Sequence, residues 1–178
     1  MGCCGQQTFG AALPALAPGV AATFAIAELD GSATKKVRLL RMAISGTALT
    51  AIEIDNLRLT KLSSISTGGV AVIGVATPFD SAFNAPTAVF RGFTTAPTGG
   101  GVVIGAIAVT KFTTDVITTL MPPPGPGIVF DFTNLPDSSK PTLHNAAEAL
   151  ALDFNGATPA HADTLDIYAW WSEQPLNS

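Results

Sequence analysis

Short runs of β-forming residues recur along most of this sequence, and glycine, proline, asparagine or aspartate closes each run. Runs of this kind, rich in Val, Ile, Thr and Phe, predict β-strands. We expect strands near residues 20–29, 36–45, 50–60, 69–77, 87–93, 102–110, 128–133, 147–154 and 164–172. No segment has a good amphipathic helical pattern. The chain is therefore predicted to be all-β, a jelly-roll-like antiparallel β-sandwich.

The C-terminal part of the chain alternates most clearly. Residues 144–152 contain good helix formers, but Leu150, Leu152 and Phe154 alternate with smaller or polar residues, which favours a strand. Alternating residues of a strand point to opposite faces of the sheet. The next strand, from Leu165 onward, follows the same pattern.

Two adjacent tryptophans in this last strand must face opposite sides of the sheet. The phase set by Leu165 and Ile167 places Trp171 in the core and Tyr168 and Trp170 on the other face. An outward aromatic pair suits a subunit interface or stacking on a sugar. The alternative is a second buried face of the sheet.

The first nineteen residues predict an extended N-terminal arm, followed by a single β-sandwich domain over 20–178. The arm has no charged residue, and its two prolines prevent a continuous helix. Its spaced apolar residues suit contact with a neighbouring chain, and a disordered tail is the alternative. With the outward aromatic residues they form the candidate partner interface: Phe9, Leu13, Leu16, Tyr168 and Trp170.

The chain carries few charges for its size. Charged residues make up 12% of the 178 residues, against about 25% in typical soluble proteins. Hydrophobic residues make up 47%, and the mean hydropathy is +0.40. Large exposed apolar patches usually mark contact sites, so we expect part of the surface to be buried in a homo-oligomer or larger assembly. The alternative is a sandwich rich in Thr and Ala that needs few charges.

Charge and cysteine content narrow the functional classes. The net charge is −4, and the nine basic residues are scattered, whereas nucleic-acid binding needs a concentrated basic patch. The two cysteines, Cys3 and Cys4, are adjacent, so no disulfide framework is expected. No basic region precedes an apolar stretch as in a signal peptide, and no apolar run is long enough to span a membrane. We expect neither nucleic-acid nor membrane partners.

The sequence offers little catalytic or metal-binding chemistry. His144 and His161 fall in predicted loops, and their spacing matches no metal-ligand motif. Glu53 and Asp55 share one face of a strand, a pattern more typical of a solvated face than of acid–base catalysis. We therefore expect no catalytic residue, metal or cofactor. The long loop over 134–145 is a natural place for partner contacts.

Parts of the sequence resemble small virion proteins of tailed bacteriophages. The matching stretches are Glu148–Ala157, Leu165–Trp170 with Trp171-Ser-Glu173, and the earlier Val37–Ser45. The resemblance implies a jelly-roll-like sandwich, often trimeric, that decorates or cements the capsid or sits at the head or tail. Such families carry no catalytic residues.

These observations lead to one main functional hypothesis. The chain is expected to be a non-enzymatic capsid decoration or cement protein that binds, as a trimer, across subunits of the major capsid protein. It would assemble in the host bacterial cytoplasm and reside on the virion. One alternative is a tail, fibre or collar component, including one that binds glycans. Another is a hydrolase or sugar-modifying enzyme that uses Glu53 or Asp55.

Overall fold

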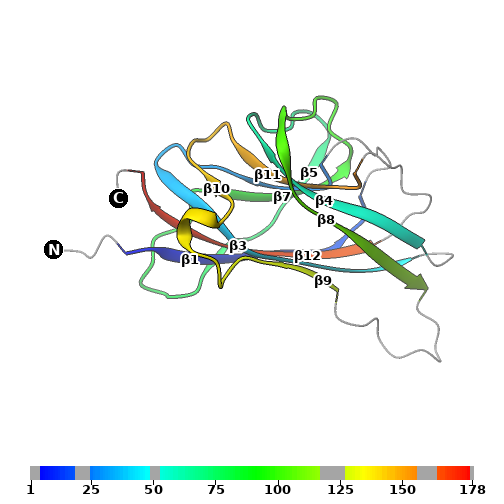
Figure 1. Ribbon diagram of the computed structural model, residues 1–178, viewed down its shortest axis with the longest axis horizontal. Helices are drawn as coiled ribbons and strands as arrows, with labels where there is room; N and C mark the ends of the chain where they lie inside the picture. The colour runs from blue at the N-terminus through cyan, green and yellow to red at the C-terminus, as the bar shows by residue number, and fades with distance from the viewer. Residues whose placement is uncertain (1–4, 19–24, 49–52, 117–126, 156–163, 177–178) are drawn as a thin grey trace.

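The computed structural model describes residues 5–18, 25–48, 53–116, 127–155 and 164–176 (Figure 1). Two antiparallel sheets pack against each other, which confirms the predicted all-β sandwich. The described residues contain no α-helix, only one 3-10 turn, η1 (Asp137–Ser139). No helix within them is long and apolar enough to cross a membrane.

We call the first sheet sheet A. Its strands, in spatial order, are β6 (Thr77–Pro78), β1 (Gln7–Leu16), β12 (Thr164–Pro175) and β3 (Lys35–Ala48). Two short strands, β10 (Thr142–Leu143) and β9 (Ile128–Asp131), pair in turn with the other edge of β3. The long β3 is therefore paired along both edges and lies at the centre of this sheet.

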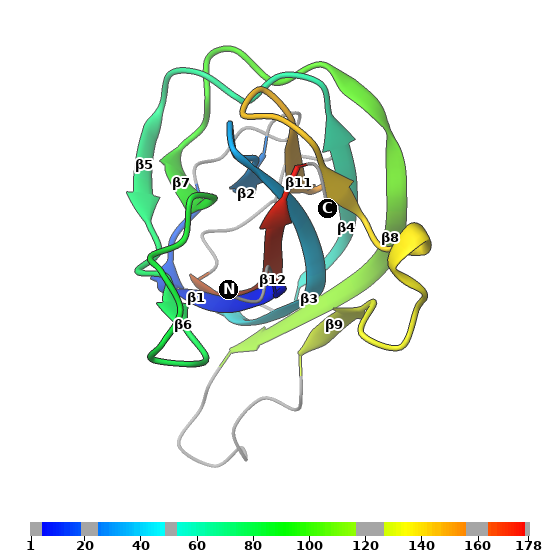
Figure 2. The same ribbon diagram turned by 90° about the vertical axis from the view of Figure 1, so that its left-hand side faces the viewer.

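We call the second sheet sheet B. Its spatial order is β5 (Val70–Ile73), β7 (Val89–Thr95), β2 (Ala27–Asp30), β11 (Ala149–Asp153), β4 (Glu53–Leu62) and β8 (Val103–Val116). The end of β8 runs parallel to the end of β3, with Thr47 opposite Asp115 and Ala48 opposite Val116. This contact joins the two sheets, and Figure 2 shows them curling around one interior.

The expectation of a separate N-terminal arm is wrong, because its residues form strand β1 of sheet A. Residues 7–16 pair with β12 in sheet A, and Phe9, Leu13 and Leu16 are buried in the chain's own core. Pro14 is tolerated because the pairing is irregular between Leu13 and Leu16. There Ala15 takes a positive φ of 51°. The free amide of Ala15 donates to the Asp166 carboxylate at 2.8 Å.

The last strand packs as its alternation predicted. Trp171 is fully buried, whereas Tyr168 and Trp170 are 44% and 37% exposed. Trp171 lies opposite Leu39 on β3. The residue before it, Trp170, lies opposite Arg41, which leaves Leu40 without a partner on β12. This β-bulge moves the inward side of β3 from odd to even positions while β12 stays regular.

A buried carboxylate ties a loop to this strand. Glu173 Oε1 accepts hydrogen bonds from the Trp171 indole (3.1 Å) and from the Ala88 amide (2.9 Å). Its Oε2 accepts from the Thr87 hydroxyl at 2.8 Å. The Trp-x-Glu pattern thus has a structural role, since one ionised side chain satisfies several donors that burial removes from water.

The strand reading of residues 149–153 is also confirmed. Leu150 and Leu152 face the core between the two sheets, whereas Ala149 and Ala151 face a smaller cluster on the outer side with Phe93. Both faces of β11 are buried, because loops cover the outer side of sheet B. The expected strand at 20–29 begins at Ala27 in the described residues. The proline-rich segment 121–126 lies outside them.

Candidate assembly surfaces

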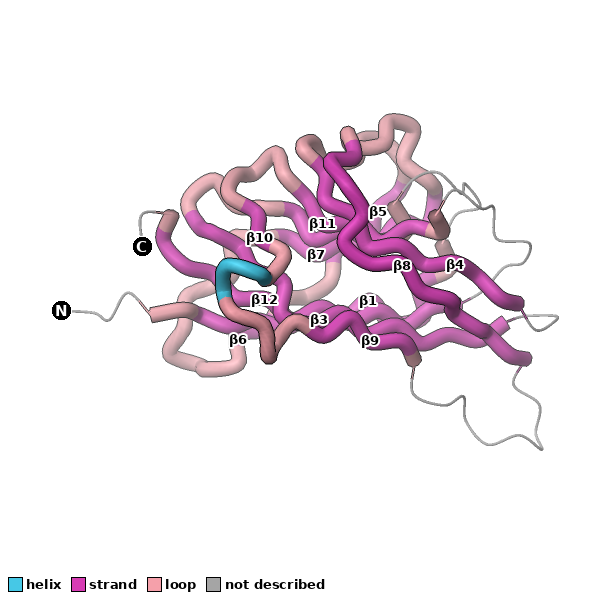
Figure 3. The backbone as a smooth tube through the Cα atoms, in the orientation of Figure 1, coloured by secondary structure: helices cyan, strands magenta, loops and turns pink. Residues whose placement is uncertain are grey.

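The most exposed apolar strand is β5, at one edge of sheet B. All four of its residues are exposed, including Val70 and Ile73 at 57% each, and Val75 just beyond is 83% exposed. Its only strand partner among the described residues is β7. In the described structure, the other edge of β5 therefore presents unpaired backbone groups beside exposed apolar side chains. Figure 3 traces the backbone of β5 and β7.

The opposite edge of sheet B has the same character. Val103 and Ile104 of β8 are 50% and 59% exposed, and Val109 is 56% exposed. A side chain added at Gly105 would meet no atom within 4 Å. In the described part of the chain, β8 pairs with β4 and touches β3 only at its far end. Most of its second edge is unpaired.

Neither β5 nor the start of β8, residues 103–110, carries the usual protection against association. Natural edge strands are commonly blunted by lysine, proline or inward-pointing charges. No charged residue lies between Lys61 and Asp80, or between Arg91 and Lys111. These uncharged stretches contain β5 and the exposed start of β8. The sequence concentrates its sparse charges elsewhere and leaves both edges free to pair.

Two loops fix the position of these edges. The segment leading from β4 to β5 and the one leading from β7 to β8 run side by side over the outer face of sheet B. Thr67 and Gly99 exchange backbone hydrogen bonds of 2.8 and 3.0 Å, and the Ser63 amide donates to the Val102 carbonyl at 2.8 Å. The glycine run before β8 thus lies in a loop that is bridged to the segment before β5.

A buried charge cluster anchors the loop that enters β5. Glu28 is fully buried, and its Oε1 accepts hydrogen bonds from the amide (3.1 Å) and hydroxyl (2.8 Å) of Ser66. Its Oε2 accepts from Arg91 Nη2 at 2.9 Å. Arg91 lies opposite Ile73 of β5, and its Nε is 3.0 Å from Asp30 Oδ2. The cluster holds the strands beneath the open edge in place.

The cluster also has unusual acid–base properties. Burial raises the pKa of Asp30 to about 7, although the charge of Arg91 opposes the shift. Burial likewise raises the pKa of Glu28, against the hydrogen bonds from Ser66 and the charge of Arg91. Asp30 Oδ1 is buried and accepts no hydrogen bond in the described structure. One guanidinium is thus shared between two carboxyl groups that would both be ionised in water.

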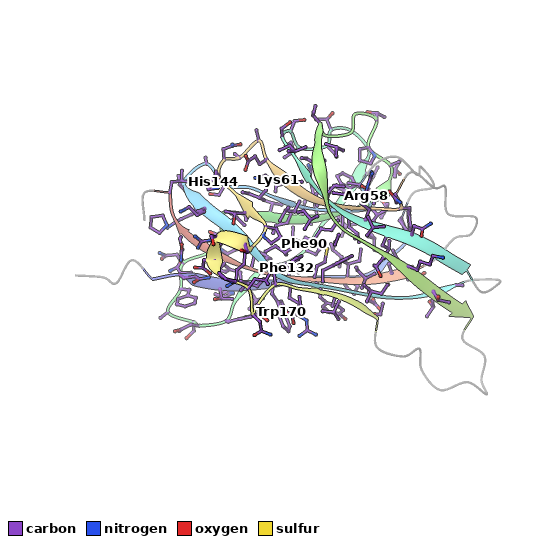
Figure 4. The ribbon with its side chains drawn as sticks, viewed as in Figure 1. Arg58, Lys61, Phe90, Phe132, His144 and Trp170 are labelled. Carbon is purple, nitrogen blue, oxygen red and sulfur yellow. The ribbon has the colours of Figure 1, made fainter. Side chains whose placement is uncertain are left out.

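An aromatic cluster lies on the outer face of sheet A (Figure 4). The Phe79 ring meets the Trp170 ring edge-on at 5.9 Å, and the Arg41 guanidinium lies 4.8 Å from the centre of the indole. Gly10 makes room for this contact, because a Cβ there would lie 2.8 Å from Phe79 and 3.0 Å from Trp170. Trp170 therefore has ring partners within its own chain, which reduces the surface it offers to a sugar.

The structure divides the five residues of the candidate partner interface. Phe9, Leu13 and Leu16 are 0%, 1% and 3% exposed, so the assignment of these three to a partner surface is corrected. They alternate along a strand rather than anchoring an arm. Tyr168 and Trp170 are exposed on sheet A, where contact with a partner remains a prediction.

The structure describes only part of the acidic and histidine side chains that could serve in catalysis or metal binding. Among the described residues, no group of three His, Cys, Asp or Glu side chains could hold a metal ion. Asp153 is buried and pairs with Arg58 at 3.0 Å, as a structural ion pair. His144 is exposed, whereas His161 and the side chains of Glu53 and Asp55 lie outside the described residues.

Comparison with known protein families, curated proteins and solved structures found no match. The surface features that sequence reasoning missed are the two open edges of sheet B. The available signal was the long uncharged stretches around Val70–Ile73 and Val102–Val109, which contain no lysine or proline within the apolar run. Strand order, which the sequence does not reveal, decides that both stretches lie at edges.

Proposed function

We propose that this chain is a non-enzymatic structural protein that assembles with further protein chains through the open edges of sheet B. The observation that carries the proposal is β5, an edge strand whose four residues are all exposed, apolar and uncharged. Such a strand offers unpaired amides and carbonyls to an incoming strand, together with apolar area to bury. In a monomer it would be an aggregation hazard.

The two edges favour a head-to-tail contact between copies. The β5 edge and the β8 edge differ in sequence and lie at opposite ends of the same sheet. A contact between unlike surfaces closes into a ring when the rotation between copies allows it. Pairing β5 of one copy with β8 of the next would satisfy both edges at once. A trimer is the ring that we expect.

The sequence resemblance supports a place on a bacteriophage particle. The stretches that resemble small virion proteins correspond to β11 and β12, together with part of β3. We propose capsid decoration or cementing as the role, with the assembled protein binding across subunits of the major capsid protein. Repeated weak contacts, multiplied by symmetry, stabilise a shell without a single strong site. A tail, fibre or collar location is the competing outcome.

The first test is the solution mass of the purified chain, measured by light scattering on a sizing column. We expect a discrete oligomer, and we expect Val72→Lys and Ile104→Lys each to dissociate it, because a buried lysine at an edge is costly. Ala146→Lys is the control, since Ala146 is exposed in a loop outside both edges. A natural chain that stays monomeric at high concentration would contradict the proposed self-assembly.

The location is tested separately by electron microscopy of phage particles labelled with an antibody against this chain. Label distributed over the head supports decoration. Label confined to the tail or collar replaces that role with the competing one. Some epitopes could be hidden in intact particles, so denatured virions are probed with the same antibody. Particles that show no label when intact and no signal when denatured argue against any virion role.

A further inference from the structure

A groove of about 450 Å³ opens where one loop crosses from sheet A to sheet B. Its walls come from both sheets and from the segment that carries η1 and β10. Lys36 and Arg38 project from β3, Lys61 from β4, and Lys140 from the crossing segment. Figure 4 labels Lys61 and, on the crossing segment, His144, which also lines the groove. Of the residues in β5 and β8, only Ile107 of β8 is among those that line the groove.

The groove gathers positive charge on an acidic protein. Four of the nine lysines and arginines in the chain line it, although the chain as a whole has a net charge of −4. The only carboxylate among the lining residues is Asp137. Outside the lining, the Glu148 carboxylate lies 3.4 Å from Lys61 Nζ. Three of the cations, Arg38, Lys61 and Lys140, thus share two carboxylates, those of Asp137 and Glu148.

Asp137 already occupies the position of an anion. Its carboxylate lies 2.9 Å from Lys140 Nζ and 3.5 Å from Arg38 Nη1. The hydrogen bond from Lys140, with the charges of both cations, lowers the pKa of Asp137. The Asp137 side chain is 49% exposed, whereas those of Arg38 and Lys140 are 12% and 11% exposed. The cations are held by the fold, and the carboxylate is free to move away.

The groove also carries hydroxyl groups, since Ser138 and Ser139 line it and are exposed. Arg38 Nη1 donates to the Gln174 side chain, which fixes the guanidinium beside Asp137. A guanidinium, ammonium groups and hydroxyls are the donor set that proteins use for phosphate oxygens.

We infer that this groove binds an oxyanion of the phosphate class with two or more negative charges, and that the Asp137 carboxylate is the group it displaces. A multiply charged anion offsets the excess of positive charge better than a single carboxylate does. Its several oxygens can accept from Arg38, Lys140 and the two serines together. The ligand would bridge β3 to the crossing segment. This inference is independent of the proposed assembly.

The test is titration calorimetry of the full chain with inorganic pyrophosphate at low ionic strength and pH 8. We expect saturable binding that weakens as salt is added, because exposed charges are screened. Lys140→Gln should weaken binding about fivefold, since it removes one cation at the site. Asp137→Asn should strengthen binding about threefold, since it removes the competing carboxylate.

The matched control is Lys111→Gln, which removes the same charge from β8 outside the groove and should leave the affinity unchanged. Opposite changes in Lys140→Gln and Asp137→Asn, with no change in Lys111→Gln, support the site. Equal weakening by both lysine variants would mean general attraction to charge and overturn it. Absence of saturable binding to the natural chain and to Asp137→Asn would also overturn it.

Folding of each variant is checked by its thermal midpoint without ligand. Asp137 is half exposed, so Asp137→Asn should melt close to the natural chain, and Lys140→Gln keeps most of the partly buried side-chain stem, so it should retain a cooperative transition. Pyrophosphate should raise the midpoint of the natural chain and of Asp137→Asn, because a ligand that binds only the folded state stabilises it. A midpoint that pyrophosphate leaves unchanged in both chains contradicts the site even if the solution mass shows the expected oligomer.

Discussion

Strands β12 and β5 are both rich in apolar residues, yet they contribute to the protein in different ways. β12 is paired along both edges, with β1 on one side and β3 on the other, and its inner face includes the fully buried Trp171. Among the described residues, β5 is paired along one edge only, and every one of its residues is exposed. The apolar side chains of β12 stabilise the fold because they are buried within the chain. Those of β5 remain on the surface, where a partner chain could bury them.

The difference comes from position in the sheet rather than from composition. The backbone groups of a central strand form hydrogen bonds along both of its edges, and the facing sheet covers its side chains. An edge strand keeps a row of unpaired donors and acceptors, whatever its side chains are. Four predictions test this difference between central and edge positions. They are given in order of decreasing expected effect on stability.

Replacing the inward tryptophan should cost far more than replacing its outward neighbour. Trp171→Ala should lower the free energy of unfolding by about 4 kcal/mol, because it leaves a large cavity in the core. Trp170→Ala should cost about 1 kcal/mol, the contribution of its contacts with Phe79 and Arg41. Urea unfolding of both variants measures the difference, and equal losses would contradict the assignment of inner and outer faces.

Glu173→Gln should lower the free energy of unfolding by about 2 kcal/mol. The substitution keeps the shape but replaces one acceptor oxygen with a donor facing Thr87. Asp137→Asn is the matched control, since its carboxylate is half exposed and makes surface ion pairs, and it should cost less than about 1 kcal/mol. The two variants are compared by urea unfolding at pH 7. A loss at Glu173 no larger than the control would contradict its role in holding the loop.

The charge cluster beneath β5 should make stability rise as the pH falls from 8 to 5. The pKa of Asp30 is about 7 in the folded chain and 3.8 for the unperturbed side chain, so as the pH falls the folded chain takes up the proton first. The cost of ionisation is absent below pH 3.8 and complete above pH 7. The gain from pH 8 to pH 5 should be about 2 kcal/mol, with Glu28 acting in the same direction.

Asp30→Asn should remove most of this pH dependence, which urea unfolding at pH 5 and pH 8 measures directly. Asp131→Asn is the control. Hydrogen bonds from Thr133 lower the pKa of the exposed Asp131, so it titrates below this window. If the change in the free energy of unfolding between pH 5 and pH 8 persists in Asp30→Asn, or disappears in Asp131→Asn, the effect belongs to other groups.

The smallest effect on stability is expected at the open edge. Val72→Ala should change the free energy of unfolding by less than about 0.5 kcal/mol in dilute solution, because the side chain is already 45% exposed. Leu152→Ala, on the fully buried β11, should cost about 3 kcal/mol. Thermal unfolding at two protein concentrations checks this pair. A large loss at Val72 in the monomer would show that β5 is needed for folding.

Several elements of the fold could be predicted from residue pattern alone. The alternation at Leu150, Leu152 and Phe154 identified a strand, and the phase of Leu165 and Ile167 placed Trp171 inside. Local period is enough for such assignments because side chains of a strand alternate between faces. The first strand was missed, since its prolines, its glycine and its lack of charge resemble a tail. The irregular pairing at Pro14 is what admits it to the sheet.

The candidate sites were less accessible to sequence reasoning. The four cations of the groove are spread from Lys36 to Lys140 along the chain, so they form no single cluster in the sequence. They meet because β3 and β4 both neighbour β8 in the strand order, and the segment that carries η1 and β10 crosses from sheet A to sheet B beside them. The open edges likewise depend on strand order. No local pattern distinguishes Val70–Ile73 from a central strand.

By itself, the sequence determined the all-β class, the approximate limits of most strands and the inward or outward direction of the last tryptophans. These properties depend on residues that are near one another along the chain, where backbone geometry fixes the period. Only the tertiary structure decided that residues 7–16 belong to the sandwich, that β5 and β8 are edges and that distant cations share one groove. Those outcomes depend on pairing between strands that are far apart in the sequence. The pairing that forms is the one that buries the most apolar surface overall, and no short segment encodes it.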